Sequence, residues 1–192
     1  MYREVNLRKT LTVYYLVDTG SQMTGDKISS INSAIEEAII VDLADISTAN
    51  DDAEIRVAII QFSNGASWVT PGAIPLDDFI WNDPHASGSN DFGQALHLLE
   101  EELKSFDPCM NFAPIVVAFS NAAVTDEYIE ILKQLNQVEC FRQGRKIGIA
   151  IGEDADKQAL EAFVGSSGAV LAVNDKHTLK SLMRKTNIEV DE

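Results

Sequence analysis

Short apolar runs alternate with longer segments of helical period along this chain, and this alternation most constrains its fold. Five apolar runs have the length and the branched residues typical of buried strands: 11–18, 54–63, 114–120, 146–152 and 169–173. A short run at 67–71 follows the second of them across a Ser-Asn-Gly turn. We expect it to form a short antiparallel edge strand.

Between these runs, apolar residues recur at steps of three and four, as on one face of a helix. The helical segments are 28–46, 92–106, 128–135, 155–163 and 179–183. Strands separated by helices imply right-handed crossovers. The fold class is therefore α/β: a doubly wound, mostly parallel sheet with helices on both faces. No repeat or long linker divides the chain, so residues 1–192 are expected to form a single domain.

The net charge of −15, from 30 acidic and 15 basic residues, restricts the partners. A surface this negative repels nucleic acid and anionic membranes, because both are bound through Lys and Arg. Basic protein surfaces and cations suit it better, although the charge also serves solubility. No apolar run is long enough to cross a bilayer, and no secretory signal is present. We therefore expect a cytoplasmic protein.

The segment Asp18-Thr19-Gly20-Ser21 has the letters of an aspartic protease active site. Such a protease needs two carboxylates that share a proton, from two motifs or a symmetric dimer. No second motif occurs here, and the first runs into a long helix, whereas those enzymes are nearly all β. The sequence therefore argues against a protease. It also lacks a phosphate-binding loop, a dinucleotide fingerprint and a nucleophile elbow, and its three histidines share no metal-ligand spacing.

A strand that ends in Asp, then a loop of small residues, then Met and a long helix resembles the opening of von Willebrand factor A domains. Three later stretches also match that family in order: SGSNDFGQAL at 87–96, PIVVAFSNAAVTDEY at 114–128 and KIGIAIGEDAD at 146–156. The last of them, and GDKISSIN at 25–32, are similar to the bacterial TerY-like group associated with tellurium resistance.

In that family these loops build a metal-ion-dependent adhesion site, which holds a Mg²⁺-like ion through oxygen ligands. Carried over by position, the resemblance places Asp18, Gln22, Asn90 and Asn121 at the metal, while Gly20 stands where a serine ligand would be. Asn121 in place of an aspartate removes on the order of several kcal/mol of gross attraction for a divalent ion. A net loss of ~1.4 kcal/mol already weakens binding tenfold. The resemblance thus implies a degenerate site with no tightly bound cofactor, and at most weak Mg²⁺ or Ca²⁺ binding.

Two alternatives remain open for these polar residues. In the first, the site is rearranged and its side-chain carbonyl oxygens still bind a cation. In the second, Asp18 and the amides only form hydrogen bonds with the backbone of their own loops. The adjacent Asp91 is expected to point away from the site.

The resemblance implies a non-enzymatic protein–protein interaction module, in a bacterial stress-response system with phosphatase or kinase partners or another basic surface. The residues expected to contact a partner are Asp18, Ser21, Ser89, Asn90 and Asn121. The alternative is a metal-dependent ligand-binding domain or enzyme that uses the same pocket.

Overall fold

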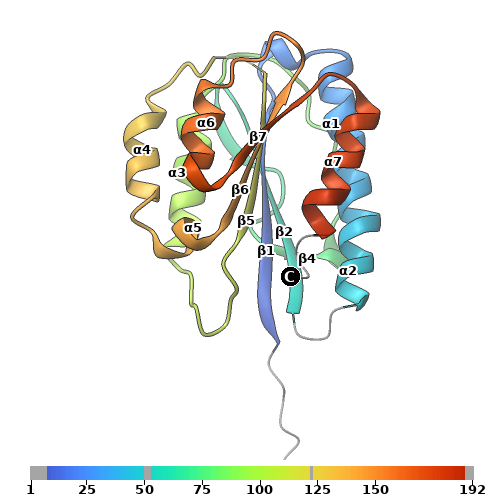
Figure 1. The fold of residues 1–192 in the computed structure, drawn as a ribbon, viewed down its shortest axis with the longest axis vertical. Coiled ribbons are helices and arrows are strands. Elements are labelled where there is room, and N and C mark those ends of the chain that lie inside the picture. Colours follow the sequence, from blue (N-terminus) through green and yellow to red (C-terminus); the bar gives the residue numbers. More distant parts are fainter. Residues whose placement is uncertain (1–7, 50–52, 122, 189–192) are drawn as a thin grey trace, which may run out of the picture.

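A computed structural model describes residues 8–49, 53–121 and 123–188 of the chain and shows a seven-stranded sheet between two layers of helices (Figure 1). The strand order is β3-β2-β1-β5-β6-β7, and β4 also pairs with β2. The strands are β1 (Lys9–Asp18), β2 (Ala53–Ser63), β3 (Gly65–Trp68), β4 (Ile74–Pro75), β5 (Ile115–Ser120), β6 (Arg145–Ile151) and β7 (Ala169–Val173). The α-helices are α1 (Asp26–Glu37), α2 (Ala44–Ala49), α3 (Phe92–Leu103), α4 (Tyr128–Leu135), α5 (Glu139–Gln143), α6 (Gln158–Val164) and α7 (Lys176–Ile188).

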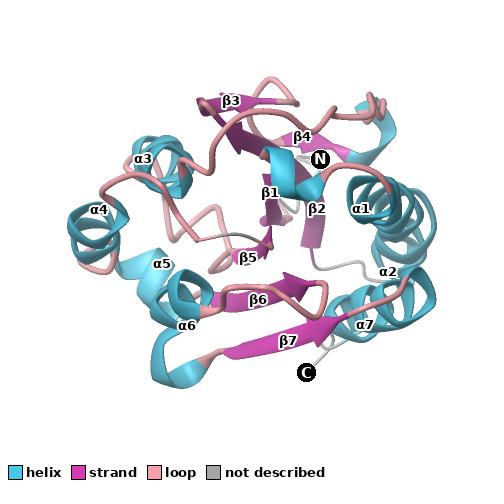
Figure 2. Cartoon of the chain, turned by 90° about the horizontal axis from the view of Figure 1, so that it is seen from above, coloured by secondary structure: helices cyan, strands magenta, loops and turns pink. Residues whose placement is uncertain are grey.

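The long strands β1, β2, β5, β6 and β7 run parallel, which confirms the predicted doubly wound α/β class. β5 is buried along its whole length and β1 over most of it, as their continuous apolar sequences require. Helices α1, α2 and α7 cover one face of the sheet, and α3, α4, α5 and α6 cover the other (Figure 2).

The antiparallel edge beside β2 differs in detail from the prediction of one short strand. β3 begins at Gly65, directly after the turn, and pairs with the end of β2, while the two-residue β4 pairs with its beginning. β4 and the five-residue α5 were not predicted. Two residues are too few to alternate, and the only apolar residues of α5, Cys140 and Phe141, are adjacent and show no helical spacing.

The long helix predicted over 28–46 is present, but it is not uniform. α1 continues through a π-helical turn at Ala38–Leu43 into α2. The apolar stripe stays buried through this turn, so the periodicity alone does not reveal it.

Within the described residues, no helix is long and apolar enough to span a membrane. Because the strands are parallel, the carboxyl ends of β1, β2, β5 and β6 lie on the same side of the sheet. The candidate residues predicted from the sequence lie in the loops that follow these carboxyl ends, and ligands bind there in open α/β sheets.

Candidate functional site

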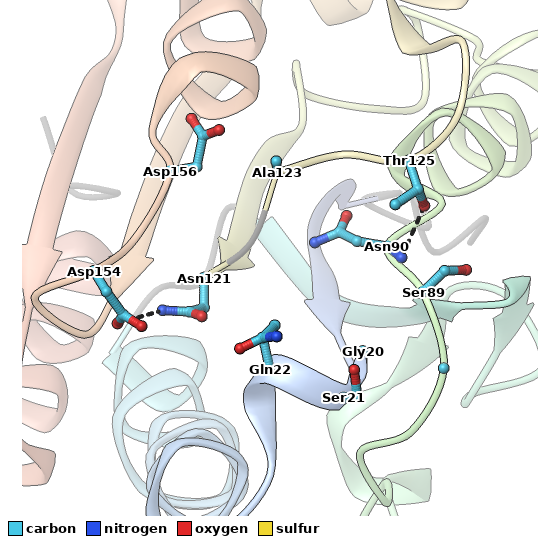
Figure 3. A pocket seen from close by; sticks show the side chains of 11 residues that line it. Gly20, Ser21, Gln22, Ser89, Asn90, Asn121, Ala123, Thr125, Asp154 and Asp156 are labelled. Atoms are coloured by element: carbon cyan, nitrogen blue, oxygen red, sulfur yellow. Dashed lines mark hydrogen bonds between the residues drawn. The ribbon is translucent and has the colours of Figure 1, made fainter.

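Loops at the carboxyl edge of the sheet enclose an open pocket of about 430 Å³ (Figure 3). Among the described residues that line it, most are neutral and polar, and the carboxylates are those of Asp154 and Asp156. The lining residues are Gly20, Ser21, Gln22, Gly88, Ser89, Asn90, Asn121, Ala123, Thr125, Asp154 and Asp156.

Asp18, at the end of β1, lies beneath this pocket and is 0% exposed. Its Oδ1 accepts a hydrogen bond from the backbone N–H of Gly20 at 2.7 Å. Its Oδ2 accepts from Asn90 Nδ2 and from Ser120 Oγ, both at 2.7 Å, and from the backbone N–H of Asn121 at 3.3 Å. A buried carboxylate is tolerated when donors surround it, and here they come from three different loops.

Gly20 brings the first loop into direct contact with the second. A Cβ built on Gly20 would lie 2.4 Å from the backbone oxygen of Ser89 and 3.0 Å from Asp18 Oδ1. The backbone of Gly20 has φ −65°, which any residue can adopt, so close approach and not conformation requires glycine here. No space remains for the serine ligand that the sequence resemblance implies at this position.

The Asn121 side chain turns away from Asp18. Its Nδ2 donates to the backbone oxygen of Ile151, at the end of β6, and to Asp154 Oδ1 at 3.2 Å (Figure 3). Lys27 of α1 contacts the same Asp154 oxygen at 3.2 Å, and these two donors hold the pKa of the Asp154 carboxyl below its usual value. Asn121 therefore joins the β5 and β6 loops and does not present an oxygen to Asp18.

Asp91 and Asp126 fasten the remaining loops to α3. Asp91 accepts from the backbone N–H of Gly65 at 2.7 Å, from Thr125 Oγ1 at 2.8 Å and from Ser89 Oγ at 3.1 Å. Asp126 accepts from the first two backbone N–H groups beyond Phe92, at the beginning of α3, where a negative charge is favoured. Asp91 thus satisfies a backbone donor at the start of β3, and Asp126 satisfies two backbone donors in the first turn of α3.

These hydrogen bonds, first of all the one from Gly65, hold the pKa of Asp91 below its usual value. A carboxyl with a depressed folded-state pKa stabilises the protein above its unfolded-state pKa, and this stability is lost as the pH falls through the folded-state pKa. We expect Asp91→Asn to lower the free energy of unfolding by about 1–2 kcal/mol at pH 7. The difference from the wild type should shrink as the pH falls below about 4, as urea denaturation across this range would measure. If the difference in unfolding free energy between the two proteins did not change with pH, this interpretation of Asp91 would be wrong.

The structure brings most of the predicted site residues together. Ser21, Gln22, Ser89, Asn90 and Asn121 line the pocket, and Asp18 lies below the lining and contacts Asn90. Sequence reasoning did not name Thr125, Asp154 or Asp156 as site residues, although all three line the pocket. Thr125 lies in the matched stretch at 114–128, beyond the end of β5, and no motif there singles it out.

The donor set around Asp18 does not fit a hard divalent cation. Mg²⁺ requires six oxygen ligands in near-octahedral geometry. The oxygens of Asp18 face N–H groups and a hydroxyl donor, the carbonyl of Ser89 is packed against Gly20, and the Asn121 amide donates toward β6. A cation there would require both Asn amides to rotate and the first loop to open.

Another group of metal-ligand type lies on α3. Ligand atoms of His97, Glu100 and Glu101 lie within 4.8 Å of one another, at a spacing that sequence reasoning did not recognise. Lys104, at the end of α3, forms ion pairs with both carboxylates, so its positive charge already occupies their ligand atoms.

No family model and no curated protein matches this sequence. Solved structures do match it. They include a von Willebrand factor type A protein from Catenulispora acidiphila (TM-score 0.69, 15% identity, 94% of this chain and 42% of that chain). The ArnB paralog VWA2 from Sulfolobus acidocaldarius matches with a TM-score of 0.69, 15% identity and coverage of 92% and 45%. The VWA domain of SpRpn10 matches with a TM-score of 0.62, 14% identity and coverage of 91% and 94%.

These likenesses show that the chain has the von Willebrand factor A fold, and at such identities they show the fold alone. The chain spans less than half the length of the first two proteins and nearly all of the SpRpn10 domain. A further match is the proximal thread matrix protein 1 of the mussel byssus, with a zinc-occupied metal-ion-dependent adhesion site (TM-score 0.67, 16% identity, coverage of 96% and 48%).

Proposed function

We propose that this chain is a non-enzymatic protein-interaction module that binds its partner at the pocket without a resident metal ion. Von Willebrand factor A domains generally mediate protein–protein contacts. The observation that carries the proposal is the hydrogen bonding of Asp18, whose two oxygens accept from four donors of the chain itself. These donors join the same loops that an ion would otherwise hold, so the pocket keeps its shape without one.

The surface presented to a partner is polar and, where it is charged, negative. Asp154 and Asp156 lie on one wall of the pocket, Ser89 and Thr125 on the opposite wall, and Gln22 between them (Figure 3). With a net charge of −15, this surface favours a partner with a basic contact region. Asp18, which is buried, contributes by positioning the loops and not by direct contact.

The stretches KIGIAIGEDAD at 146–156 and GDKISSIN at 25–32 support a setting in a bacterial stress-response system of the tellurium-resistance type, in which a phosphatase or kinase is the partner. This setting rests on the sequence resemblance. The proposed module comprises residues 1–192 as a single domain.

The interaction is tested by changing an exposed residue at the centre of the pocket. We expect Gln22→Arg to reduce capture of the partner from an extract of the native host at least tenfold, because it places bulk and positive charge in the contact region. The matched control is Gln134→Arg on α4, because Gln134 is also exposed but lies outside the pocket.

Capture should be the same in EDTA and in Mg²⁺. Proteins captured equally by wild type and by Gln22→Arg would contradict the pocket as the contact surface. Capture that requires Mg²⁺ would support the alternative of a metal-dependent ligand-binding domain.

A further inference from the structure

The last strand, β7, leaves one edge of the sheet open. It ends the strand order, and among the described residues it pairs with β6 alone. Figure 2 shows α6 and α7 on either side of this strand and no described segment beyond it. An open edge presents backbone groups that can pair with another strand.

The register with β6 identifies these backbone groups. The backbone oxygen of Val173 accepts from the N–H of Gly152 at 2.7 Å, so Val173 bonds toward β6. In a parallel ladder both backbone groups of a residue point to the same side, and successive residues alternate. Val170 and Ala172 therefore direct their N–H and C=O groups outward, which gives two donors and two acceptors along this edge.

None of the usual features that protect an edge strand is present within β7. Its sequence, Ala-Val-Leu-Ala-Val, contains no proline and no charge, and all five residues pair with β6 in unbroken register. Ala169 and Ala172 are exposed, and Val170 and Leu171 are partly exposed. The chain as a whole carries a net charge of −15, so an uncharged strand at the sheet edge is suited to pairing.

We propose that two copies of this chain associate through β7, antiparallel across a two-fold axis that places Leu171 opposite Leu171 of the second copy. In this register Val170 lies opposite Ala172 of the second copy, and Ala172 opposite its Val170. Both are outward-bonding pairs, so each exchanges two hydrogen bonds, four in all. A register shifted by one residue would place an outward-bonding residue opposite one that bonds to β6.

Side-chain sizes also match in this register. Ala169 lies opposite Val173 of the second copy, so a small residue faces a larger one in every pair except the central one. The two Leu171 residues form a non-hydrogen-bonded pair, the type in which side chains approach most closely. The strand is therefore complementary to itself, and a two-fold interface uses the same surface patch on both copies.

The net charge of each copy opposes this association. Two chains of charge −15 repel one another, and salt screens that repulsion over about 10 Å at 0.1 M ionic strength. The dimer should therefore strengthen as the salt concentration rises. The interface lies outside the residues that line the pocket, so it does not depend on the proposed interaction with a partner protein.

Disulfide capture tests the register directly. In a Cys109→Ser background, which removes the exposed native thiol, Leu171→Cys should cross-link two chains in a glutathione redox buffer. The Cα atoms of a directly opposite, non-hydrogen-bonded pair lie about 4.5 Å apart, which suits a disulfide. The matched control is Ala172→Cys, because the two copies of that residue lie diagonally, about 7–8 Å apart. We expect at least tenfold faster cross-linking at position 171, and equal rates would overturn the proposal.

Sedimentation of the wild-type chain from 10 to 500 µM, in about 50 mM and about 500 mM NaCl, tests the association without substitutions. We expect a monomer–dimer equilibrium that shifts to the dimer in high salt. Ala172→Pro removes one outward N–H and leaves the bonds to β6, so it should abolish the dimer, while Ala172→Thr retains it. Circular dichroism would check that both variants are folded. A wild-type chain that stays monomeric under every condition overturns the proposal.

Discussion

Replacing Asp18 by Asn lowers the free energy of unfolding by about 3–5 kcal/mol in our expectation, equally in EDTA and in Mg²⁺. The carboxylate is fully buried and accepts hydrogen bonds from Gly20, Asn90, Ser120 and Asn121. An amide at this position would turn an NH₂ group toward buried donors and leave them without an acceptor. Chemical denaturation monitored by circular dichroism measures the loss.

Asp45→Asn is the matched control for this experiment. Asp45 is an exposed carboxylate on α2, and its replacement should change the free energy of unfolding by less than about 0.5 kcal/mol. If Asp18→Asn destabilised the chain only when Mg²⁺ was present, the carboxylate would be serving an ion and our account of it would be wrong.

Introducing a side chain at Gly20 should cost about 2–3 kcal/mol, because the new Cβ would lie 2.4 Å from a backbone oxygen that the fold holds in place. That oxygen belongs to Ser89, which is held in place by hydrogen bonds to Asn64 and Ser63. The second loop would have to move away, and the bond from Asn90 to Asp18 would move with it. Thermal and chemical denaturation measure the effect.

Gly20→Ala and Gly20→Ser form a matched pair. Both add a Cβ, and only serine adds the hydroxyl that the sequence resemblance implies as a metal ligand. We expect equal losses, with no recovery of Gly20→Ser in about 10 mM Mg²⁺. Selective recovery of the serine variant would mean that the loops remain able to assemble a metal site.

The long elements of the fold were predictable because each carries many periods of its pattern. β1, β5 and β6 are continuous apolar runs, and the stripe over 28–46 spans three turns or more. β4 has two residues and α5 has five, and the π-helical turn keeps the same residues buried as a regular helix would. Tertiary contacts determine these short features, and the sequence carries no local signal for them.

The site was predictable in its location and not in its hydrogen bonding. Strand ends fix which loops meet, and this brought Asp18, Asn90 and Asn121 to the same edge. The two asparagines look equivalent in the sequence, but one donates to Asp18 and the other to β6. That difference depends on the side-chain rotamers of the two asparagines and on the close approach of the two loops at Gly20. Neither feature is encoded in a sequence periodicity or motif.

Titration of Mg²⁺ into EDTA-treated, dialysed protein by isothermal calorimetry tests whether an ion or the chain itself satisfies the buried carboxylate of Asp18. Our account is that hydrogen-bond donors of the chain satisfy it. It predicts no saturable heat with a Kd below about 1 mM, for the wild type as for Asp18→Asn. A Kd of about 10 µM or lower in the wild type that is lost in Asp18→Asn would contradict it.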